Sequence, residues 1–208
     1  MKFRNYQNRT TILIPMRALD EGKSRLSNVL SPSSRSRLVE LLFSQLLKKL
    51  NILRCQFPPI FSDVVVITPC KKVKDLSEEF NAIVLEEPMP NNLNSALTLG
   101  LSWSYENDYN SSLIIPGDII DPLTKDIRKI ITLGKKASEC MIISPSIDFG
   151  TNALFLSLPT RMNLKFGPNS FFEHQKEAAK QSIKTIIAPL DSLKDDLDTG
   201  KDLKLLKT

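Results

Sequence analysis

The chain has 208 residues, 41% hydrophobic and 25% charged, with a formal net charge of +5 that admits either nucleic acid or small anions as partners. That length is enough for one sizeable core and short for two, so we expect a single globular domain over residues 1–208. No apolar run approaches the roughly 20 residues that span a bilayer, and the apolar patch after the basic start is too short for a signal peptide.

The first half of the chain alternates apolar strands with helical patterns. Thr11–Met16 is rich in β-branched residues and predicts a strand. Ser31 as N-cap and Pro32 at the first helical position predict a helix. Its buried face is expected from the leucines at helical spacing: Leu38, Leu41, Leu42, Leu46 and Leu50. Two more buried strands are predicted, Asp63–Thr68 and Asn81–Glu87, with a charged helix between them.

The second half continues this order with a helix over residues 91–105, a strand over 112–116, a helix near Leu123–Lys136 and a strand over Cys140–Pro145. A strand over Ala153–Ser157 and a helix from about Phe171 follow. Repeated strand–helix–strand order predicts an α/β fold with a mainly parallel sheet between helices.

Asp118 stands just beyond the apolar run Leu113–Ile115 and the break at Pro116-Gly117. A carboxylate at the end of a buried strand is unfavourable unless something pairs with it. Ligands of open α/β sheets bind beyond the carboxyl ends of the strands, where Arg17, Asp118 and the loop after Thr68 should gather. The alternative is that Asp118 only caps a helix or forms a turn.

The segment Arg17–Leu26, "RALDEGKSRL", follows the first strand and carries Gly22, Lys23, Ser24 and Arg25. Backbone amides and several cations in such a loop suit a polyphosphate. The spacing of a Walker loop is missing, so an ATPase motor is not indicated. A basic loop that contacts only solvent is the alternative.

Asp196 and Asp198 alternate around Leu197, so both carboxylates point the same way if this segment is extended. Such carboxylates repel each other unless a cation lies between them, and oxygen-only ligands suit Mg²⁺. Thr199 and Asp202 also have the spacing of a capping box, so a capped C-terminal helix is the alternative.

Two glycine-containing segments could bind an anion. Gly150-Thr151-Asn152 precedes a strand, and Gly167-Pro168-Asn169-Ser170 leads into a helix, where exposed amides and a hydroxyl suit a phosphate or carboxylate. An ordinary N-cap at Ser170 is the alternative. His174 is the only histidine, which excludes any mechanism that needs two, and we expect it to be a surface or packing residue.

Dispersed basic residues and an aromatic content of only 7% favour small phosphorylated ligands over nucleic acid. A solvated basic surface is the alternative. Cys55, Cys70 and Cys140 are widely spaced and form no Cys-x-x-Cys pair. They indicate free thiols and a cytoplasmic location, and their spacing argues against a zinc site.

Six segments, in this order, carry a family resemblance: "IPMRALDEGKSRL", "LNSAL", "IPGDII", "GTNAL", "FGPNSFFEH" and "DLDTGKDL". Together they resemble the 2-phospho-L-lactate guanylyltransferase family of coenzyme F420 biosynthesis. The resemblance extends from Ile12 to Leu203, and "GTNAL" with "FGPNSF" is its most specific part.

The resemblance implies a single-domain, three-layer α/β/α nucleotidyltransferase of the glycosyltransferase-A-like type, with a mixed, mainly parallel sheet. It implies transfer of GMP from GTP to 2-phospho-L-lactate, phosphoenolpyruvate or 3-phosphoglycerate, with release of pyrophosphate. Mg²⁺ is the implied cofactor, and its implied ligands are Asp118, Asp196 and Asp198. The positions that match substrate-binding ones are Lys23, Asn94 (near the guanine nucleotide), Thr151, Gly167 and Ser170.

An ionised substrate phosphate needs no protein base, so catalysis requires alignment and charge neutralisation, for which Mg²⁺ and the cations Arg17, Lys23 and Arg25 would suffice. The chain departs from the family pattern at Arg17-Ala18, Ile120-Asp121 and Gly200.

Two other functions stay open: another nucleotidyltransferase of this fold, of the molybdopterin or sugar-phosphate type, and a non-catalytic nucleic-acid-binding module. Neither a membrane nor nucleic acid is an expected partner, and a homodimer is left open.

Overall fold

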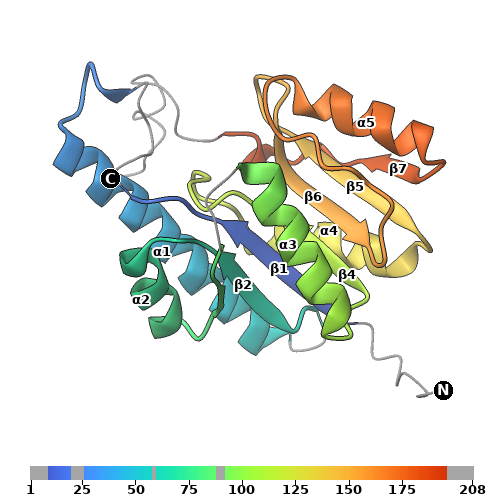
Figure 1. Cartoon of the computed structure of the whole chain (residues 1–208), viewed down its shortest axis with the longest axis horizontal. Helices are drawn as coiled ribbons and strands as arrows, with labels where there is room; N and C mark the ends of the chain where they lie inside the picture. Colours follow the sequence, from blue (N-terminus) through green and yellow to red (C-terminus); the bar gives the residue numbers. More distant parts are fainter. Residues whose placement is uncertain (1–8, 20–25, 58–59, 88–91, 196–208) are drawn as a thin grey trace.

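The computed structural model describes residues 9–19, 26–57, 60–87 and 92–195. They build a seven-stranded sheet with the order β3-β2-β1-β4-β6-β5-β7 (Figure 1). The strands are β1 Thr10–Pro15, β2 Asp63–Ile67, β3 Ile83–Leu85, β4 Ser111–Ile114, β5 Cys140–Pro145, β6 Thr151–Ser157 and β7 Lys184–Ile187. Every strand except β6 points the same way. The predicted mixed, mainly parallel sheet is confirmed.

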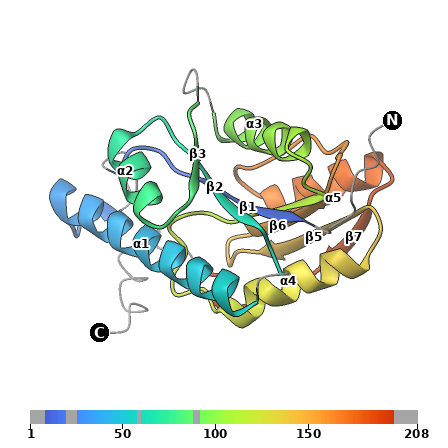
Figure 2. The same cartoon turned by 90° about the horizontal axis from the view of Figure 1, so that it is seen from below.

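Helices cover both faces of this sheet. They are α1 Pro32–Gln56, α2 Lys71–Glu79, α3 Leu93–Glu106, α4 Thr124–Lys136 and α5 Ser170–Lys180, followed by a 3₁₀ turn, η2, at Asp191–Leu193. Residues of α1, α2 and α4 pack on one face of the sheet, and residues of α3 and α5 pack on the other. Figure 2 shows α1 and α4 below the sheet and α3 above it. The three-layer α/β/α prediction is therefore confirmed.

Alternating side chains of β1 supply both halves of the core. Ile12 and Ile14 face the α1 and α4 side, whereas Leu13 faces α3. The contact with α3 is close: a Cβ on Gly100 would lie 2.6 Å from Cδ1 of Ile67. This packing fixes the amino end of α3 above the sheet, where the site described below lies.

Helix α1 begins as predicted, because Ser31 caps it and its Oγ accepts a hydrogen bond from the amide of Ser34 at 3.2 Å. Leu42, Leu46 and Leu50 are buried as expected, but Leu41 is 51% exposed. That part of the prediction was wrong. At about 100° per residue, Leu41 lies roughly opposite the buried stripe, which Val39 and the other buried residues of the helix define.

Two elements near the carboxyl terminus have weak sequence signals and were not predicted. Strand β7 has four residues, pairs only with β5 and is partly exposed, so it lacks the apolar run of a buried strand. The short 3₁₀ turn η2 follows it. Among the described helices, none combines the length and apolar character that crossing a membrane requires.

Candidate active site

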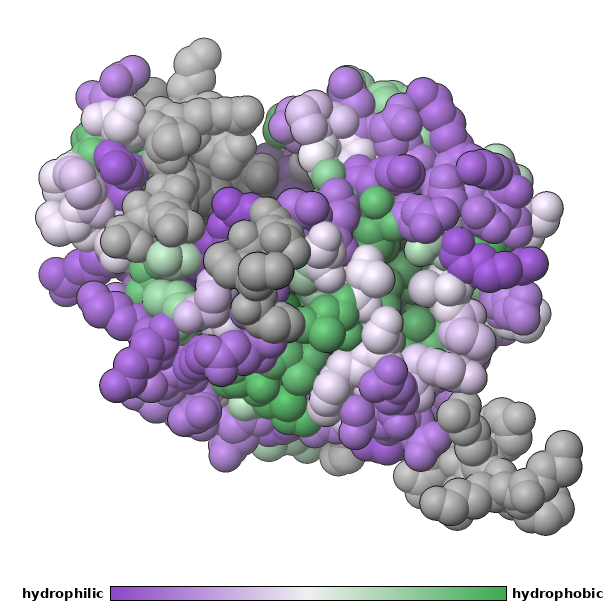
Figure 3. Space-filling model, in the orientation of Figure 1, coloured by the Kyte–Doolittle hydropathy of each residue, from purple (hydrophilic) through white to green (hydrophobic). Residues whose placement is uncertain are grey.

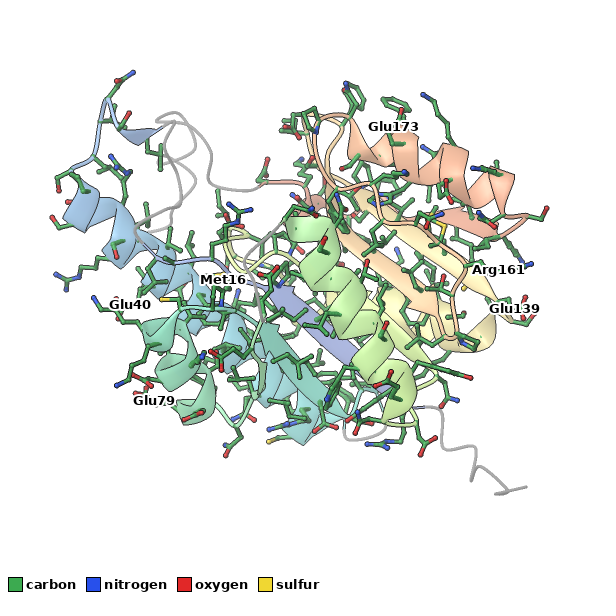
Figure 4. All side chains as sticks on the ribbon, viewed as in Figure 1. Met16, Glu40, Glu79, Glu139, Arg161 and Glu173 are labelled. Atoms are coloured by element: carbon green, nitrogen blue, oxygen red, sulfur yellow. The ribbon has the colours of Figure 1, made fainter. Side chains whose placement is uncertain are left out.

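The carboxyl edge of the sheet gathers most of the predicted site. All strands except β6 end at this edge, and β6 begins there with Thr151. Arg17 follows β1, Asp118 follows β4, and the loop after Thr68 follows β2. In Figure 4 the label of Met16 marks this end of β1. The edge predicted from strand order is therefore the place where these segments meet.

A cavity of about 490 Å³, called here the larger cavity, opens at this edge beside the amino end of α3. Its lining combines the ends of β1 and β2 with the first turn of α3: Pro15, Met16, Arg17, Ala18, Ile67, Pro69, Cys70, Glu87, Asn92, Leu93 and Ala96. Asn92 caps α3 by accepting a hydrogen bond from the amide of Ser95 at 2.9 Å. Figure 3 shows apolar surface beside α3, flanked by hydrophilic surface.

A cavity of about 210 Å³, the smaller cavity, adjoins the larger one, because Pro15 and Leu93 line both. Its lining includes Thr151, Gly167 and Ser170. These three residues come from β6, from the loop before α5 and from α5 itself. The structure thus brings together the three described residues that were predicted to surround the phosphorylated acid.

Hydrogen bonds fix the hydroxyls of the smaller cavity. Ser170 Oγ donates to Thr151 Oγ1 at 3.0 Å, and His174 Nδ1 lies 3.1 Å from the same oxygen. The amide of Lys165 donates to His174 Nε2 at 3.0 Å, so the ring proton of neutral His174 sits on Nδ1, where Thr151 Oγ1 and the backbone of Ser170 share it. Thr151 Oγ1 therefore accepts two hydrogen bonds, and its own proton remains for another acceptor.

His174 is 0% exposed and packs against the ring of Phe166, with centroids 4.8 Å apart. Burial lowers the pKa of His174 to about 4, although a hydrogen bond with the backbone of Ser170 opposes that shift. The ring is therefore neutral at pH 7. His174 is therefore not a surface residue. It packs as expected, and it also contacts the Thr151 hydroxyl of the smaller cavity. The four-residue spacing between Ser170 and His174 on one helix is the signal that could have indicated their proximity.

Ser170 is not the N-cap of α5. The helix begins at Ser170, and Asn169 is its N-cap, in the left-handed region with φ of 55°. The amides of Ser170 and Phe171 already donate to the carbonyls of Gly167 and Phe149, both at 3.1 Å. The predicted exposed amides at this helix start are thus in part used within the chain, and it is the Ser170 hydroxyl that joins the cavity network.

Asn94 holds α3 against the loop that contains Gly167. Its Nδ2 donates to the carbonyl of Phe166 at 3.1 Å, and its Oδ1 accepts from the amide of Phe166 at 2.8 Å. Both polar groups of the side chain are engaged with protein backbone. The structure therefore shows a positioning role for Asn94, and its contact with the nucleotide stays a prediction.

Asp118 is half-buried in the loop after β4. The neighbouring departures from the family pattern have structural roles: Ile120 is buried beside Leu42, and Asp121 pairs with Lys49 of α1. The amide of Ile120 also donates to the carbonyl of Asp195 at 3.1 Å. The described chain therefore reaches its end, at Asp195, next to the loop that carries Asp118.

Several predicted residues lie outside the described residues: Lys23, Arg25, Asp196 and Asp198. Within the described ranges, no group of three or more acidic, histidine or cysteine side chains could by itself hold a metal ion. Of the three predicted metal ligands, only Asp118 is described. The complete ligand set therefore stays a prediction.

The opposite edge of the sheet also has a cavity of about 490 Å³, lined by Lys135, Glu139 and Ser157 among others. Figure 4 shows Glu139 far from Met16. None of the predicted site residues lines this second cavity. Volume alone therefore does not distinguish the two edges; the candidate site is defined by the strand ends and by the polar groups that converge there.

Solved structures of nucleotidyltransferases share this fold. A nucleotidyl transferase from Methanothermobacter thermautotrophicus has a TM-score of 0.62 at 10% identity, covering 95% of each chain. A 4-diphosphocytidyl-2C-methyl-D-erythritol synthase from Anaerococcus prevotii has a TM-score of 0.60 at 10% identity, covering 96% of each chain. The chain therefore has the fold of the nucleotidyltransferase class.

Within this class, the chain belongs to the guanylyl transferase CofC like family, whose model matches residues 10–207. It is 30% identical to a 3-phospho-D-glycerate guanylyltransferase of Colwellia psychrerythraea, over 95% of this chain and 91% of that protein. It is 26% identical to a phosphoenolpyruvate guanylyltransferase of Thermobaculum terrenum (92% and 80% covered). It is 28% identical to a 2-phospho-L-lactate guanylyltransferase of Methanothermobacter thermautotrophicus (94% and 82% covered). The resemblance carried by the six sequence segments is confirmed.

Proposed function

We propose that the protein transfers GMP from GTP to the phosphate of a phosphorylated three-carbon acid and releases pyrophosphate, as a step of coenzyme F420 biosynthesis. The observation that carries this proposal is the pair of adjoining cavities at the carboxyl edge, which share Pro15 and Leu93. A two-substrate transfer needs two such neighbouring sites. The relatives named above are guanylyltransferases for three acids of this kind.

The size and lining of the two cavities support one substrate in each. The larger cavity, about 490 Å³, is of the size of a nucleotide site and begins beside Arg17. The smaller one, about 210 Å³, suits a small acid and contains Thr151, Gly167 and Ser170. GTP therefore occupies the larger cavity and the acid the smaller one.

The chemistry needs no general base. An oxygen of the acceptor phosphate, already ionised at neutral pH, attacks the α-phosphorus of GTP. The bond from that phosphorus to the oxygen bridging to the β-phosphate breaks, and pyrophosphate leaves. The protein aligns the two phosphates and neutralises charge, with Arg17, Lys23 and Arg25 as the contributing cations.

The nucleotidyltransferase class favours a divalent cation, and we propose Mg²⁺, held by Asp118, Asp196 and Asp198. Carboxylate oxygens are its preferred protein ligands. Support comes from the hydrogen bond between the amide of Ile120 and the carbonyl of Asp195. Ile120 is two residues after Asp118, and Asp195 directly precedes Asp196. When bound, Mg²⁺ supplies positive charge to the triphosphate.

Location and assembly belong to the same proposal. Cys55, Cys70 and Cys140 all carry free thiols, which supports a reducing, cytoplasmic compartment. A homodimer stays a prediction that light scattering on the purified protein would test.

The test is pyrophosphate release from GTP with Mg²⁺ and, in turn, each of the three acids. We expect release with at least one acid, none without acid, and a lower rate when ATP replaces GTP. Equal rates with GTP and ATP, or turnover only with CTP and a sugar phosphate or pterin, would instead support another nucleotidyltransferase of this fold. Tight, salt-sensitive binding of DNA without turnover would support the nucleic-acid-binding alternative.

A further inference from the structure

Strand β6 contains a bulge at the smaller cavity. Along the β5–β6 pair, Ser144 lies opposite Ala153 and Pro145 lies opposite Thr151, so Asn152 is an extra residue on β6. A bulge re-aims side chains that would otherwise alternate between the two faces of the sheet. As a result, Thr151 and Asn152 both line the smaller cavity, although they are consecutive in the chain.

The Asn152 side chain carries an unused donor at this place. Asn152 is 5% exposed, and its Nδ2 is buried without a hydrogen-bond partner in the described part of the chain. Buried donors almost always have a partner, because an unsatisfied one destabilises the fold. An unpartnered amide on a residue that lines a cavity therefore indicates a ligand that supplies the missing acceptor.

The other polar side chains lining the smaller cavity are already engaged. Ser146 Oγ donates to Asp148, whose carboxylate also accepts from the amide of Gly150. Ser170 Oγ donates to Thr151. No described Lys or Arg lines the cavity. The side-chain donors that remain for an anionic ligand are the hydroxyl proton of Thr151 and the amide of Asn152.

We propose that Asn152 recognises the acceptor: its Nδ2 donates a hydrogen bond to a carboxylate oxygen of the phosphorylated acid. This inference rests on the proposed function and assigns an orientation to the acid. Pro116, two residues before Asp118, lies on the cavity wall, so the acid in this cavity is within reach of the loop that carries Asp118. We assign the carboxylate to Thr151 and Asn152, whose neutral donors suit an anion.

The test compares wild type with Asn152→Leu, which keeps the size of the side chain and removes the amide. Each protein is assayed with the preferred acid and with the analogue in which the carboxylate is reduced to a hydroxymethyl group, for example 3-phosphoglycerate and glycerol 3-phosphate. We expect kcat/KM for the acid to fall about ten- to a hundredfold, as for loss of a hydrogen bond to a charged group. The analogue should react equally slowly with both proteins, and KM for GTP should not change.

Two controls separate recognition from folding. The Tm of Asn152→Leu should be equal to or above that of wild type, because no described hydrogen bond of Nδ2 is lost. Asn163→Leu removes a partnered amide outside the cavity, the donor to Glu177, and should leave kcat/KM unchanged. A lowered Tm with equal losses for acid and analogue would overturn the proposal.

Calorimetric titration of both proteins with the acid keeps this inference distinct from the proposed function. Binding that is ten- to a hundredfold weaker in Asn152→Leu supports the role of Asn152 even if wild type transfers no GMP. Equal binding by the two proteins overturns that role even if wild type turns over rapidly.

Discussion

At the scale of single residues, the site depends on a chain of hydrogen bonds that begins at the amide of Lys165 and passes through His174 to Thr151. Each member fixes the next: the amide sets the tautomer of the ring, and the ring and Ser170 together occupy the acceptor capacity of the Thr151 oxygen. The hydroxyl of Thr151 is thereby left as a donor. A neutral donor of fixed direction suits an anion in a cavity where no described cation lies.

Replacing Ser170 or Thr151 by alanine should therefore lower kcat/KM for the acid and leave KM for GTP unchanged. We expect kcat/KM for the acid to fall about ten- to a hundredfold in each variant. Because the two hydroxyls are hydrogen-bonded to each other, the double variant should lose less than the two single losses combined. Steady-state kinetics with each substrate varied would measure this. A raised KM for GTP with an unchanged kcat/KM for the acid would mean that the two substrates are assigned to the wrong cavities.

His174 predicts a dependence of stability on pH. Its pKa is about 4 in the folded protein against 6.5 for an unperturbed histidine, so the unfolded chain binds the proton first. The stabilisation is complete above about pH 6.5 and is lost as pH falls towards 4, by about 3 kcal/mol in total. Denaturant unfolding of wild type and of His174→Gln across this range should show the two stability curves converging at low pH. Parallel curves would contradict the buried, neutral ring.

At the scale of elements, α3 is the wall between the two cavities. Its first residue, Leu93, lines both, and Asn94 joins it to the backbone of Phe166 in the loop before α5. That loop requires glycine at position 167, where φ is +143°. The geometry of the smaller cavity therefore depends on a hydrogen-bonded contact between two elements that are far apart in the sequence.

Asn94→Ala should remove both hydrogen bonds that hold this loop against α3. Because the lost contact positions Gly167, we expect KM for the acid to rise several-fold to about tenfold, with a smaller change for GTP. Thr98→Ala, on the exposed side of the same helix, is the matched control and should behave like wild type. If the main effect of Asn94→Ala is on GTP, the residue contacts the nucleotide as the family resemblance implies.

Sequence patterns were informative for the elements with long apolar runs or clear caps. Strands β1, β2, β4 and β5 and the start of α1 at Ser31 lie close to their predicted positions. Less could be predicted where tertiary contacts determine the direction of a strand or the role of a side chain. The reversed direction of β6 and its bulge at Asn152 depend on pairing with β4 and β5, and edge strand β7 has no apolar run. The role of His174 likewise depends on Lys165 and Thr151, which no local pattern connects to it.

At the scale of the whole molecule, the parallel strands place the loop of Asp118 at the edge of the sheet where both cavities lie. The end of the described chain, Asp195, lies at the same edge, hydrogen-bonded to that loop. Asp118→Asn should lower Mg²⁺-dependent pyrophosphate release by at least about a hundredfold, because it removes a carboxylate proposed to hold the Mg²⁺ that neutralises the phosphates. Asp121→Asn is the control, since Asp121 pairs with Lys49 of α1. Circular dichroism should show both variants folded. Near-normal turnover of Asp118→Asn at limiting Mg²⁺ would exclude Asp118 as a ligand.

In the proposed reaction, a phosphate oxygen of the acid attacks the α-phosphorus of GTP. The most direct measurement is mass spectrometry of the products formed from GTP and an acid whose phosphate carries a heavy oxygen isotope. We expect a guanylylated acid that retains all of the label and pyrophosphate that carries none. Label in the pyrophosphate, or GMP as the only nucleotide product, would contradict it.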